Sequence, residues 1–237
     1  SIDSTNSFAK SLAQLGAVHG HCVIAEQQTD GRGRQGKKFH SPNNQGVYVS
    51  VIIRPKLSVE YALTITSCAA VAVAEAIEKV SGLECGIKWV NDIYANGKKL
   101  CGILTEAAID VEQGGLEYAV IGIGINVSNT LFPKELENIA TSIRAETGSG
   151  VNRSQLIAEV LNCLERRLNT ITSQDFIEEY RRRSILIGKT IVVTQGDTSR
   201  TVLCTGIDSL GKLLVKNEKG EEEALTGGTV RFPDEEV

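Results

Sequence analysis

The sequence predicts an α+β protein in which a mixed β-sheet flanked by helices precedes a small C-terminal β-barrel. Three observations support this fold class. Apolar runs with the two-residue period of strands recur between residues 22 and 126, and segments with the 3.6-residue period of helices separate and follow them. Short β runs divided by glycine-containing turns then fill residues 189–232, as in an SH3-like barrel. We therefore expect two domains, at residues 1–186 and 187–237.

Length, composition and charge limit the function. The 237 residues are 41% hydrophobic and 23% charged, as in a globular protein. The net charge of −4 argues against a general nucleic-acid binder, which needs a broad basic surface. We find no run of eighteen apolar residues and no apolar signal core near the start, so we expect a cytoplasmic protein without a membrane span. The six cysteines lack paired spacing, which predicts free thiols.

The first helix is expected close to the start of the chain. Phe8, Leu12 and Leu15 have helical spacing, and Asp3 or Ser4 can cap the helix that they define. A helix start also presents hydroxyl and backbone N–H groups to a polar ligand, although capping alone would explain these residues.

The most unusual stretch is residues 30–39, which contain three glycines, four cations and Phe39 between two predicted strands at 22–26 and 47–53. Glycine allows close approach of the backbone to a ligand, and arginine offers a planar fork to carboxylate or phosphate. We interpret the stretch as a loop that closes over an anionic small molecule. A solvated basic turn and an arginine-glycine nucleic-acid contact are the alternatives.

The middle of the chain predicts a buried helix followed by a hairpin. Residues 59–80 are rich in Ala, Leu, Ile and Val, which indicates a long, largely buried helix. The strand-like runs 86–94 and 99–106 are separated by Asn96-Gly97, a strong signal for a two-residue hairpin. Such a hairpin brings Asp92 and Lys99 to comparable heights on adjacent strands. A solvated cation at the end of a strand is the alternative for Lys99.

Residues 117–125 predict a further strand that ends at Asn126. Its Gly122-x-Gly124 lacks the third glycine and the following capped helix of a dinucleotide-binding fingerprint, so we reject that function. Glycines inside an apolar strand leave room for an apolar ligand against the sheet.

The remaining segments are predicted to be structural. Phe132-Pro133 predicts the start of a short helix, and residues 140–150 look irregular. Residues 153–171 and 174–183 predict two amphipathic helices. The three arginines at 181–183 lie at a helix C-terminus, where cations interact favourably with the helix dipole.

Five motifs in this order resemble the motif set of the biotin protein ligases. They are Asp3-Ser4-Thr5-Asn6, Gly31 to Gly36, Lys88-Trp89-Val90-Asn91-Asp92, Lys99 to Leu104, and Gly122 to Asn126. The resemblance covers nearly the whole chain and implies a class II synthetase-like catalytic domain. It further implies that biotin and ATP, with Mg²⁺, form biotinyl-5′-adenylate and pyrophosphate. Biotin would then pass to a lysine of the biotin carboxyl-carrier domain of a biotin-dependent carboxylase.

The resemblance also implies roles for individual residues. Lys99 would hold the biotin carboxylate, Arg34 would close over the phosphates, and Phe39 would cover adenine where the family often has tryptophan. The implied catalytic residues are Arg34, Lys88, Asp92 and Lys99, with Asp92 as the candidate for Mg²⁺. The implied biotin-binding residues are Ser4, Thr5, Asn6, Gln28, Arg32, Gly33, Arg34 and Lys99. The implied ATP-binding residues are Arg32, Arg34, Lys37, Phe39, Asn91 and Asn126.

Two alternatives remain at this point. The nearest is a lipoate or octanoate protein ligase or transferase of related fold, and the other is a non-catalytic binding module. Because the chain begins almost at its first motif, we expect a monofunctional ligase without an N-terminal DNA-binding domain. Edge strands of the sheet would allow a homodimer, but the sequence does not require one.

Overall fold

The larger part of the protein is a six-stranded sheet with the strand order β1-β2-β6-β5-β4-β3. The computed structural model describes residues 1–110, 112 and 114–234. The sheet consists of β1 (Cys22–Ala25), β2 (Gly46–Ile53), β3 (Gly86–Lys88), β4 (Asp92–Ala95), β5 (Lys98–Asp110) and β6 (Gly115–Asn126). Neighbouring strands pair antiparallel, and parallel pairing occurs at isolated bridges such as Ile2 to Gln28. The predicted α+β fold is confirmed.

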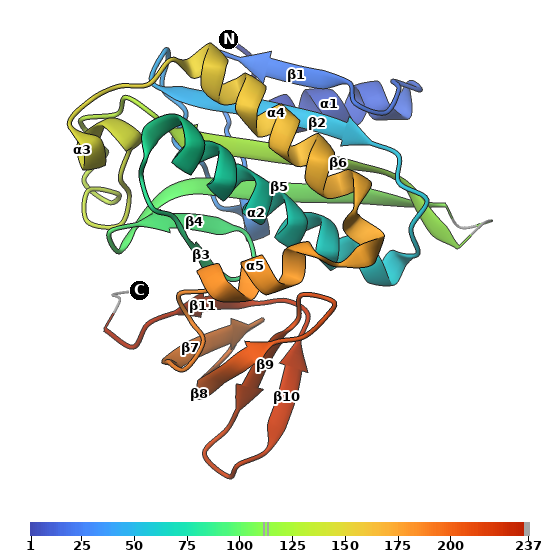
Figure 1. Ribbon diagram of the computed structural model, residues 1–237, viewed down its shortest axis with the longest axis vertical. Helices are drawn as coiled ribbons and strands as arrows, with labels where there is room; N and C mark the ends of the chain where they lie inside the picture. Colours follow the sequence, from blue (N-terminus) through green and yellow to red (C-terminus); the bar gives the residue numbers. More distant parts are fainter. Residues whose placement is uncertain (111, 113, 235–237) are drawn as a thin grey trace.

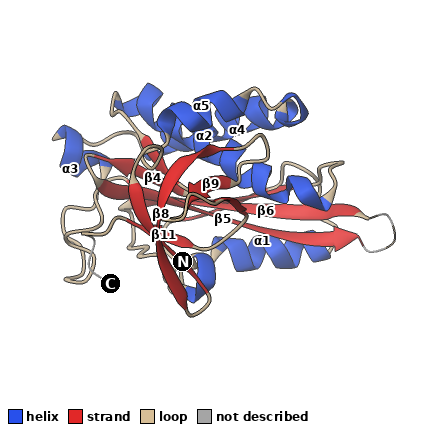
Figure 2. Ribbon diagram, turned by 90° about the horizontal axis from the view of Figure 1, so that it is seen from below, coloured by secondary structure: helices blue, strands red, loops and turns tan. Residues whose placement is uncertain are grey.

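Helices cover both faces of this sheet, as Figures 1 and 2 show. Helix α1 (Thr5–Gln14) lies on one face, against β1, β2 and β6. The other face carries α2 (Ala62–Ser81), α4 (Arg153–Asn169) and α5 (Phe176–Arg183). Because α2 packs against both the sheet and α4, it is apolar on most of its sides.

The segment Val59–Ser81 consists of a 3₁₀ turn (Val59–Tyr61) and α2. By length and composition alone, it could cross a membrane. Its mean hydropathy reaches 1.3, although the sequence offers no uninterrupted run of eighteen apolar residues. In the structure 72% of this apolar window is buried inside the protein. Its apolar character is therefore explained by its place in the core.

The buried side of α1 differs from the prediction. Phe8 and Leu15 are exposed, whereas Ala9 and Ala13 are buried with β-strand residues such as Ile52. Small alanine side chains bring the helix close to the sheet, so its first turn lies on the sheet surface. Of the three larger apolar residues that suggested the helix, Leu12 packs against this cluster, whereas Phe8 and Leu15 face away from it.

The predicted hairpin is confirmed. Asn96 and Gly97 have φ angles of 47° and 79°, the positive values that a type I′ turn requires. Tyr94 and Lys99 are partners across it. Residues 86–94 do not form one strand, however, because the chain reverses at residues 89–91 and β3 pairs antiparallel with β4.

The predictions for residues 132–150 were wrong. Pro133 begins hydrogen-bonded turns, with the N–H of Leu136 donating to its carbonyl at 2.7 Å, and no helix starts there. The segment expected to be irregular contains the short helix α3 (Ile143–Thr147). Ser142 caps α3 by accepting from the N–H of Ala145 at 3.1 Å.

The C-terminal part forms a separate five-stranded sheet with the order β10-β9-β8-β7-β11. Its strands are β7 (Thr190–Gln195), β8 (Thr198–Ile207), β9 (Leu213–Lys216), β10 (Glu222–Leu225) and β11 (Thr229–Arg231). Figure 1 shows this sheet below α5 and the β3 edge of the larger sheet. Side chains of the larger part donate to its backbone: Arg181 Nε to Ile207 O at 2.7 Å, Trp89 Nε1 to Gly211 O at 2.9 Å, and Arg34 Nη2 to Gly228 O at 3.2 Å.

The arginines at the end of α5 are structural, as their position predicted. Arg183 is buried and its guanidinium pairs with Glu78 at 2.5 Å and Glu179 at 2.7 Å. Arg181 and Arg182 pair within the helix with Glu178 and Glu179. All six cysteines are free thiols.

Candidate active site

The site has a floor of bare backbone on the face of the sheet that carries α1. Gly102 of β5 lies opposite Gly124 of β6, and Gly122 lies opposite Ser50 of β2. Because alternate residues of a strand share a face, both β6 glycines open on the same side, and Asp92, the partner of Gly102 on β4, lies in the same row. A flat ligand can therefore approach the strands closely.

A group of uncharged polar side chains borders this floor at the start of α1. Thr5 donates to Gln28 Oε1 through its N–H at 2.8 Å and through its hydroxyl at 3.0 Å. Gln28 in turn donates to Ser41 Oγ at 2.9 Å. Ser4 is the N-cap of α1 and accepts from the N–H of Ser7 at 3.4 Å. The local signal for a helix cap thus also places Thr5 over the sheet.

Asn6 completes the group. The Ser50 hydroxyl lies 2.9 Å from Thr5 Oγ1 and 3.0 Å from Asn6 Oδ1, and its single proton can serve one of them at a time. Asn6 Nδ2 donates to Glu106 at 2.7 Å. A Cβ atom on Gly122 would lie 2.3 Å from Asn6 Oδ1, so this arrangement requires glycine there.

Glu106 is a functional candidate that the sequence analysis missed. Its carboxylate also lies 3.5 Å from Arg32 and 3.7 Å from Lys10, so it links β5, α1 and the glycine-arginine loop. A lone glutamate near the end of a predicted strand resembles a solvent-facing residue. One signal was available in the sequence: Gly102 and Glu106 are an even number of positions apart on one predicted strand. Such residues lie on the same face of a sheet.

The outer part of the glycine-arginine loop is exposed. Arg32 pairs with Glu106, while Lys37 points outward and its carbonyl accepts from the N–H of Gly33 at 2.7 Å. Gln35 adopts a left-handed backbone with φ of 54°. These residues turn the chain so that Arg34 points inward.

Arg34 reaches across the loop to two neutral acceptors. Its Nη1 donates to Asn91 Oδ1 at 3.1 Å and its Nη2 donates to Gly228 O at 3.2 Å. Asn91 is itself oriented by donating to Ile103 O at 2.7 Å. Burial lowers the pKa of Arg34, and the negative charge of Asp92 opposes that shift.

The hairpin brings Lys99 and Asp92 into an ion pair, with Lys99 Nζ 2.8 Å from Asp92 Oδ2. The other oxygen, Oδ1, is buried without a hydrogen-bond partner among the described residues. A buried carboxylate oxygen in this state has unused capacity for a cation or a donor. The end of the Lys99 side chain also borders Gly102.

Phe39 lies between the uncharged group and this ion pair. A Cβ atom on Gly124 would be 2.5 Å from Phe39 Cε1, and one on Gly102 would be 3.4 Å from the same ring. The ring therefore packs into the space that the two glycines leave. Asn6 borders Gly122, whereas Phe39 and Lys99 both border Gly102. The ring therefore lies between the Asn6 side chain and the Lys99 side chain.

Two further expected residues border the floor: Lys88 is the partner of Asp92 across β3 and β4, and Asn126 lies two positions beyond Gly124 on β6. Asn126 is buried, and its Nδ2 donates to Thr141 O at 3.0 Å. The Lys88 ammonium lies 5.1 Å from the centroid of the Tyr94 ring and 5.3 Å from that of Phe232. These contacts direct Lys88 towards the C-terminal end of the chain.

Comparison with known proteins assigns the family. The family model described as Biotin/lipoate A/B protein ligase family matches residues 1–126. The bifunctional ligase/repressor BirA of Bacillus subtilis (strain 168) is 36% identical over 227 residues, which cover 92% of this chain and 68% of that protein. The biotin–[acetyl-CoA-carboxylase] ligase of Paracoccus denitrificans is 30% identical over 234 residues, 93% of each chain.

A solved structure agrees with both. The biotin protein ligase from Aquifex aeolicus, in complex with biotin and ATP, has a TM-score of 0.84 and 26% identity to this chain, and covers 98% of this chain and 96% of its own. The fold and the relatives thus indicate a ligase. The chain belongs to the biotin/lipoate A/B protein ligase family.

Proposed function

We propose that this protein activates biotin with ATP to form biotinyl-5′-adenylate and pyrophosphate. It then transfers biotin to the acceptor lysine of a biotin carboxyl-carrier domain. One observation carries this proposal. Along one face of the sheet lie, in this order, a group of uncharged polar side chains, an apolar floor of glycines, and a lysine. Biotin has the same order of parts, namely a neutral ureido ring, an apolar bicycle and chain, and a carboxylate.

The ureido ring fits the group at the start of α1. Ser4, Thr5, Asn6 and Gln28 supply uncharged donors and acceptors there, and Gly33 and Arg32 lie in the loop above them. The neutral ureido group can both donate and accept hydrogen bonds, and these side chains are neutral partners for it. An uncompensated charge would be costly at this buried position. The bicycle would lie over the glycine floor in the space that the Phe39 ring fills, once that ring moves aside to cover adenine.

The carboxylate and the α-phosphate of ATP would meet near Lys99 and Arg34. Both reacting groups are anionic, so nearby cations reduce their repulsion and stabilise the charge that develops in the transition state. A carboxylate oxygen attacks the α-phosphorus, and the bond from that phosphorus to the pyrophosphate oxygen breaks. The products are the mixed anhydride and pyrophosphate.

The remaining residues would hold the nucleotide. Phe39 would cover adenine, Asn91 and Asn126 would line the nucleotide side with Lys88, and Arg32 and Lys37 would approach the phosphates from the loop. Support for this part comes from the placement of Asn91 beside Arg34 and of Phe39 beside Lys99.

Asp92 suits Mg²⁺ as a single carboxylate ligand. Its buried Oδ1 has no hydrogen-bond partner among the described residues, and these residues contain no cluster of three His, Cys, Asp or Glu side chains that would form a metal cage by themselves. Mg²⁺ often binds through one or two carboxylates and substrate phosphates. When bound, it would supply additional positive charge at the phosphates.

The second step requires an amine from another protein. The acceptor lysine attacks the carbonyl of the mixed anhydride, an amide forms, and AMP leaves. Until then the loop excludes water from the anhydride, as a lid does. We further propose that residues 1–186 form the catalytic domain and that residues 187–237 form a second domain.

Transfer to a purified apo carrier domain with ATP and Mg²⁺ tests the proposal directly. The expected result is a biotinylated lysine and biotin-dependent exchange of pyrophosphate into ATP. Lipoate replaces biotin in a parallel reaction, because the family includes lipoate ligases. Exchange with lipoate but not with biotin would overturn the assignment, and no exchange with either would exclude adenylation.

A further inference from the structure

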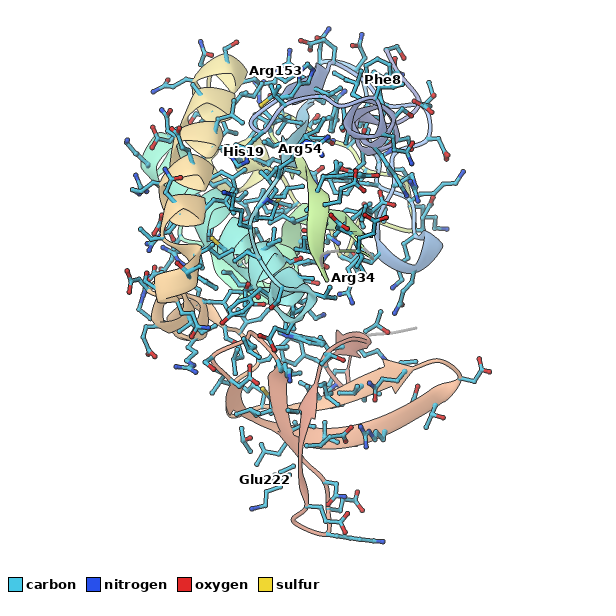
Figure 3. The ribbon with its side chains drawn as sticks, turned by 90° about the vertical axis from the view of Figure 1, so that its right-hand side faces the viewer. Phe8, His19, Arg34, Arg54, Arg153 and Glu222 are labelled. Atoms are coloured by element: carbon cyan, nitrogen blue, oxygen red, sulfur yellow. The ribbon has the colours of Figure 1, made fainter. Side chains whose placement is uncertain are left out.

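A backbone carbonyl of the five-stranded sheet contacts the glycine-arginine loop of the active site. The Gly228 oxygen accepts from Arg34 Nη2 at 3.2 Å, a contact between residues 194 positions apart in the chain. Figure 3 shows Arg34 at the boundary between the two sheets. Trp89 and Arg181 also donate across this boundary, to carbonyls of Gly211 and Ile207 that lie outside the turn of Gly228.

The turn that carries Gly228 is fixed within its own sheet. Gly228 has a φ of 130°, and a Cβ atom there would lie 2.9 Å from the Thr194 carbonyl. The preceding carbonyl, of Gly227, accepts from Gln195 Nε2 at 3.1 Å, and Thr229 pairs with Thr194 in the ladder. The position of the Gly228 oxygen is therefore set by β7 and not by the loop that it contacts.

The two arginines of the loop differ in their partners. Arg32 already pairs with the carboxylate of Glu106. Arg34 is held by the neutral oxygens of Asn91 and Gly228, and makes no ion pair within the described part of the chain. Neutral acceptors fix the plane of a guanidinium without cancelling its charge. Arg34 is thus oriented and still available to an anion.

We propose that the Gly227–Gly228 turn of the C-terminal sheet is part of the active site, where the Gly228 carbonyl positions Arg34 for the anionic groups of the substrates. Gly228 is a positioning residue, since it acts through Arg34 and contacts no reacting atom. The inference rests on the proposed adenylation. Because binding effects are reciprocal, a ligand held by Arg34 also strengthens the docking of the C-terminal sheet.

A double-mutant cycle tests the proposal. Gly228→Ala displaces the carbonyl, Arg34→Gly removes its partner, and the third protein carries both changes. The measurements are biotin-dependent pyrophosphate exchange, with KM for ATP and kcat determined separately, and the rate at which free adenylate leaves the protein. A hydrogen bond to a charged donor suggests an effect of about tenfold on KM or on release for Gly228→Ala.

The expected outcome is non-additive. Gly228→Ala impairs the wild-type protein but changes nothing further when Arg34 is already glycine, because its effect passes through that side chain. Additive losses in the double mutant, or unchanged KM and release in Gly228→Ala, would overturn the proposal. Gln195→Leu, which loosens the same turn from an exposed position, should reproduce a milder form of the defect.

The matched control is Gly220→Ala. Gly220 also has a positive φ, of 84°, and lies between β9 and β10, on the far side of the same sheet from β11. It should lower the stability of the sheet without altering exchange or release. If the wild-type protein shows no exchange with biotin, the proposed function fails. If it exchanges and the cycle is additive, only the inference about Gly228 fails.

Discussion

Lys99 and Asp92 form an ion pair across a tight hairpin, with Nζ 2.8 Å from Oδ2, on the same face of the sheet as the glycine floor. A substrate carboxylate that binds Lys99 must compete with Asp92 for the ammonium. The pair thus holds the lysine side chain in position until a stronger anionic ligand arrives.

Replacing Lys99 by alanine should reduce the rate of adenylate formation by about 10²- to 10³-fold, the usual loss when one preorganised electrostatic group is removed. The measurement is single-turnover formation of biotinyl-adenylate. The control is Lys98→Ala, because Lys98 is its sequence neighbour and donates to Glu137 O away from the site. Equal effects of the two changes would show that Lys99 has no special role.

Arg34→Gly should still form the adenylate but hold it loosely. The guanidinium bridges the loop to Asn91 and Gly228, so its loss releases the loop that covers the intermediate. We expect free adenylate to appear in solution at a higher rate, measured after rapid filtration. The control is Gln35→Gly, which adds flexibility to the same loop but keeps the Arg34 guanidinium. This variant should still retain the adenylate. Unchanged release from Arg34→Gly would refute the retention role.

Gly124→Ala should raise KM for ATP or biotin by about tenfold or more. The added methyl group would lie 2.5 Å from the Phe39 ring, which must move away from the sheet or be lost as a wall of the site. Steady-state kinetics with each substrate varied in turn provides the measurement. Gly150→Ala is the control, because a Cβ atom there meets nothing within 4 Å. Normal KM values for both substrates would contradict this arrangement.

Glu106→Leu should weaken biotin binding, since it leaves the buried Asn6 amide without its acceptor at 2.7 Å. An unsatisfied buried polar group costs about 1–3 kcal/mol, or roughly 5- to 150-fold in affinity. Glu106→Gln keeps an acceptor for Asn6 and should restore most of the affinity. Isothermal titration with biotin distinguishes the two variants. Equally weak binding by both would indicate that charge, and not the orientation of Asn6, is what matters.

Acid should weaken the cluster that joins α5 to α2. The hydrogen bond from Arg182, with the charges of Arg183 and Arg182, lowers the pKa of Glu179 from 4.5 to about 2. A lowered carboxyl pKa adds stability above pH 4.5, which is lost as the pH falls towards 2. Wild type should therefore be more stable than Glu179→Gln at pH 7, and this difference should shrink between pH 4.5 and 2.

Urea unfolding at several pH values measures that difference. The control is Glu178→Gln, because the Glu178 side chain is 77% exposed and pairs only along the helix with Arg181 in the described structure. Its difference from wild type should be small at every pH. A constant difference for Glu179→Gln across the range would contradict the linkage.

Local patterns predicted much of this structure. Asn96-Gly97 determined a hairpin and thereby the Lys99–Asp92 pair, because the turn chemistry fixes which residues face each other. The five C-terminal strands were also recognised from their glycine turns. Periodicity misled where packing space decided the result: α1 buries Ala9 and Ala13 because only small side chains fit that close to the sheet.

Long-range contacts could not be predicted in this way. Glu106 was missed because its partner Asn6 is 100 residues away, and Gly228 because its contact with Arg34 depends on how the two sheets dock. No local pattern carries that information. The individual roles of the site residues remain predictions, although the structure places Thr5, Gln28, Arg34, Phe39 and Lys99 around one floor.

The hairpin at Asn96-Gly97 also has a consequence for the order in which the protein folds. Lys99 and Asp92 are seven positions apart, so closing the chain between them costs little entropy, whereas Arg34 and Gly228 must find each other across 194 positions. We expect the lysine and its carboxylate to meet early in folding and the arginine to be locked last. During synthesis, the Lys99–Asp92 pair, which would bind the reacting groups, would then form before the Arg34–Gly228 contact, which would help to retain the adenylate.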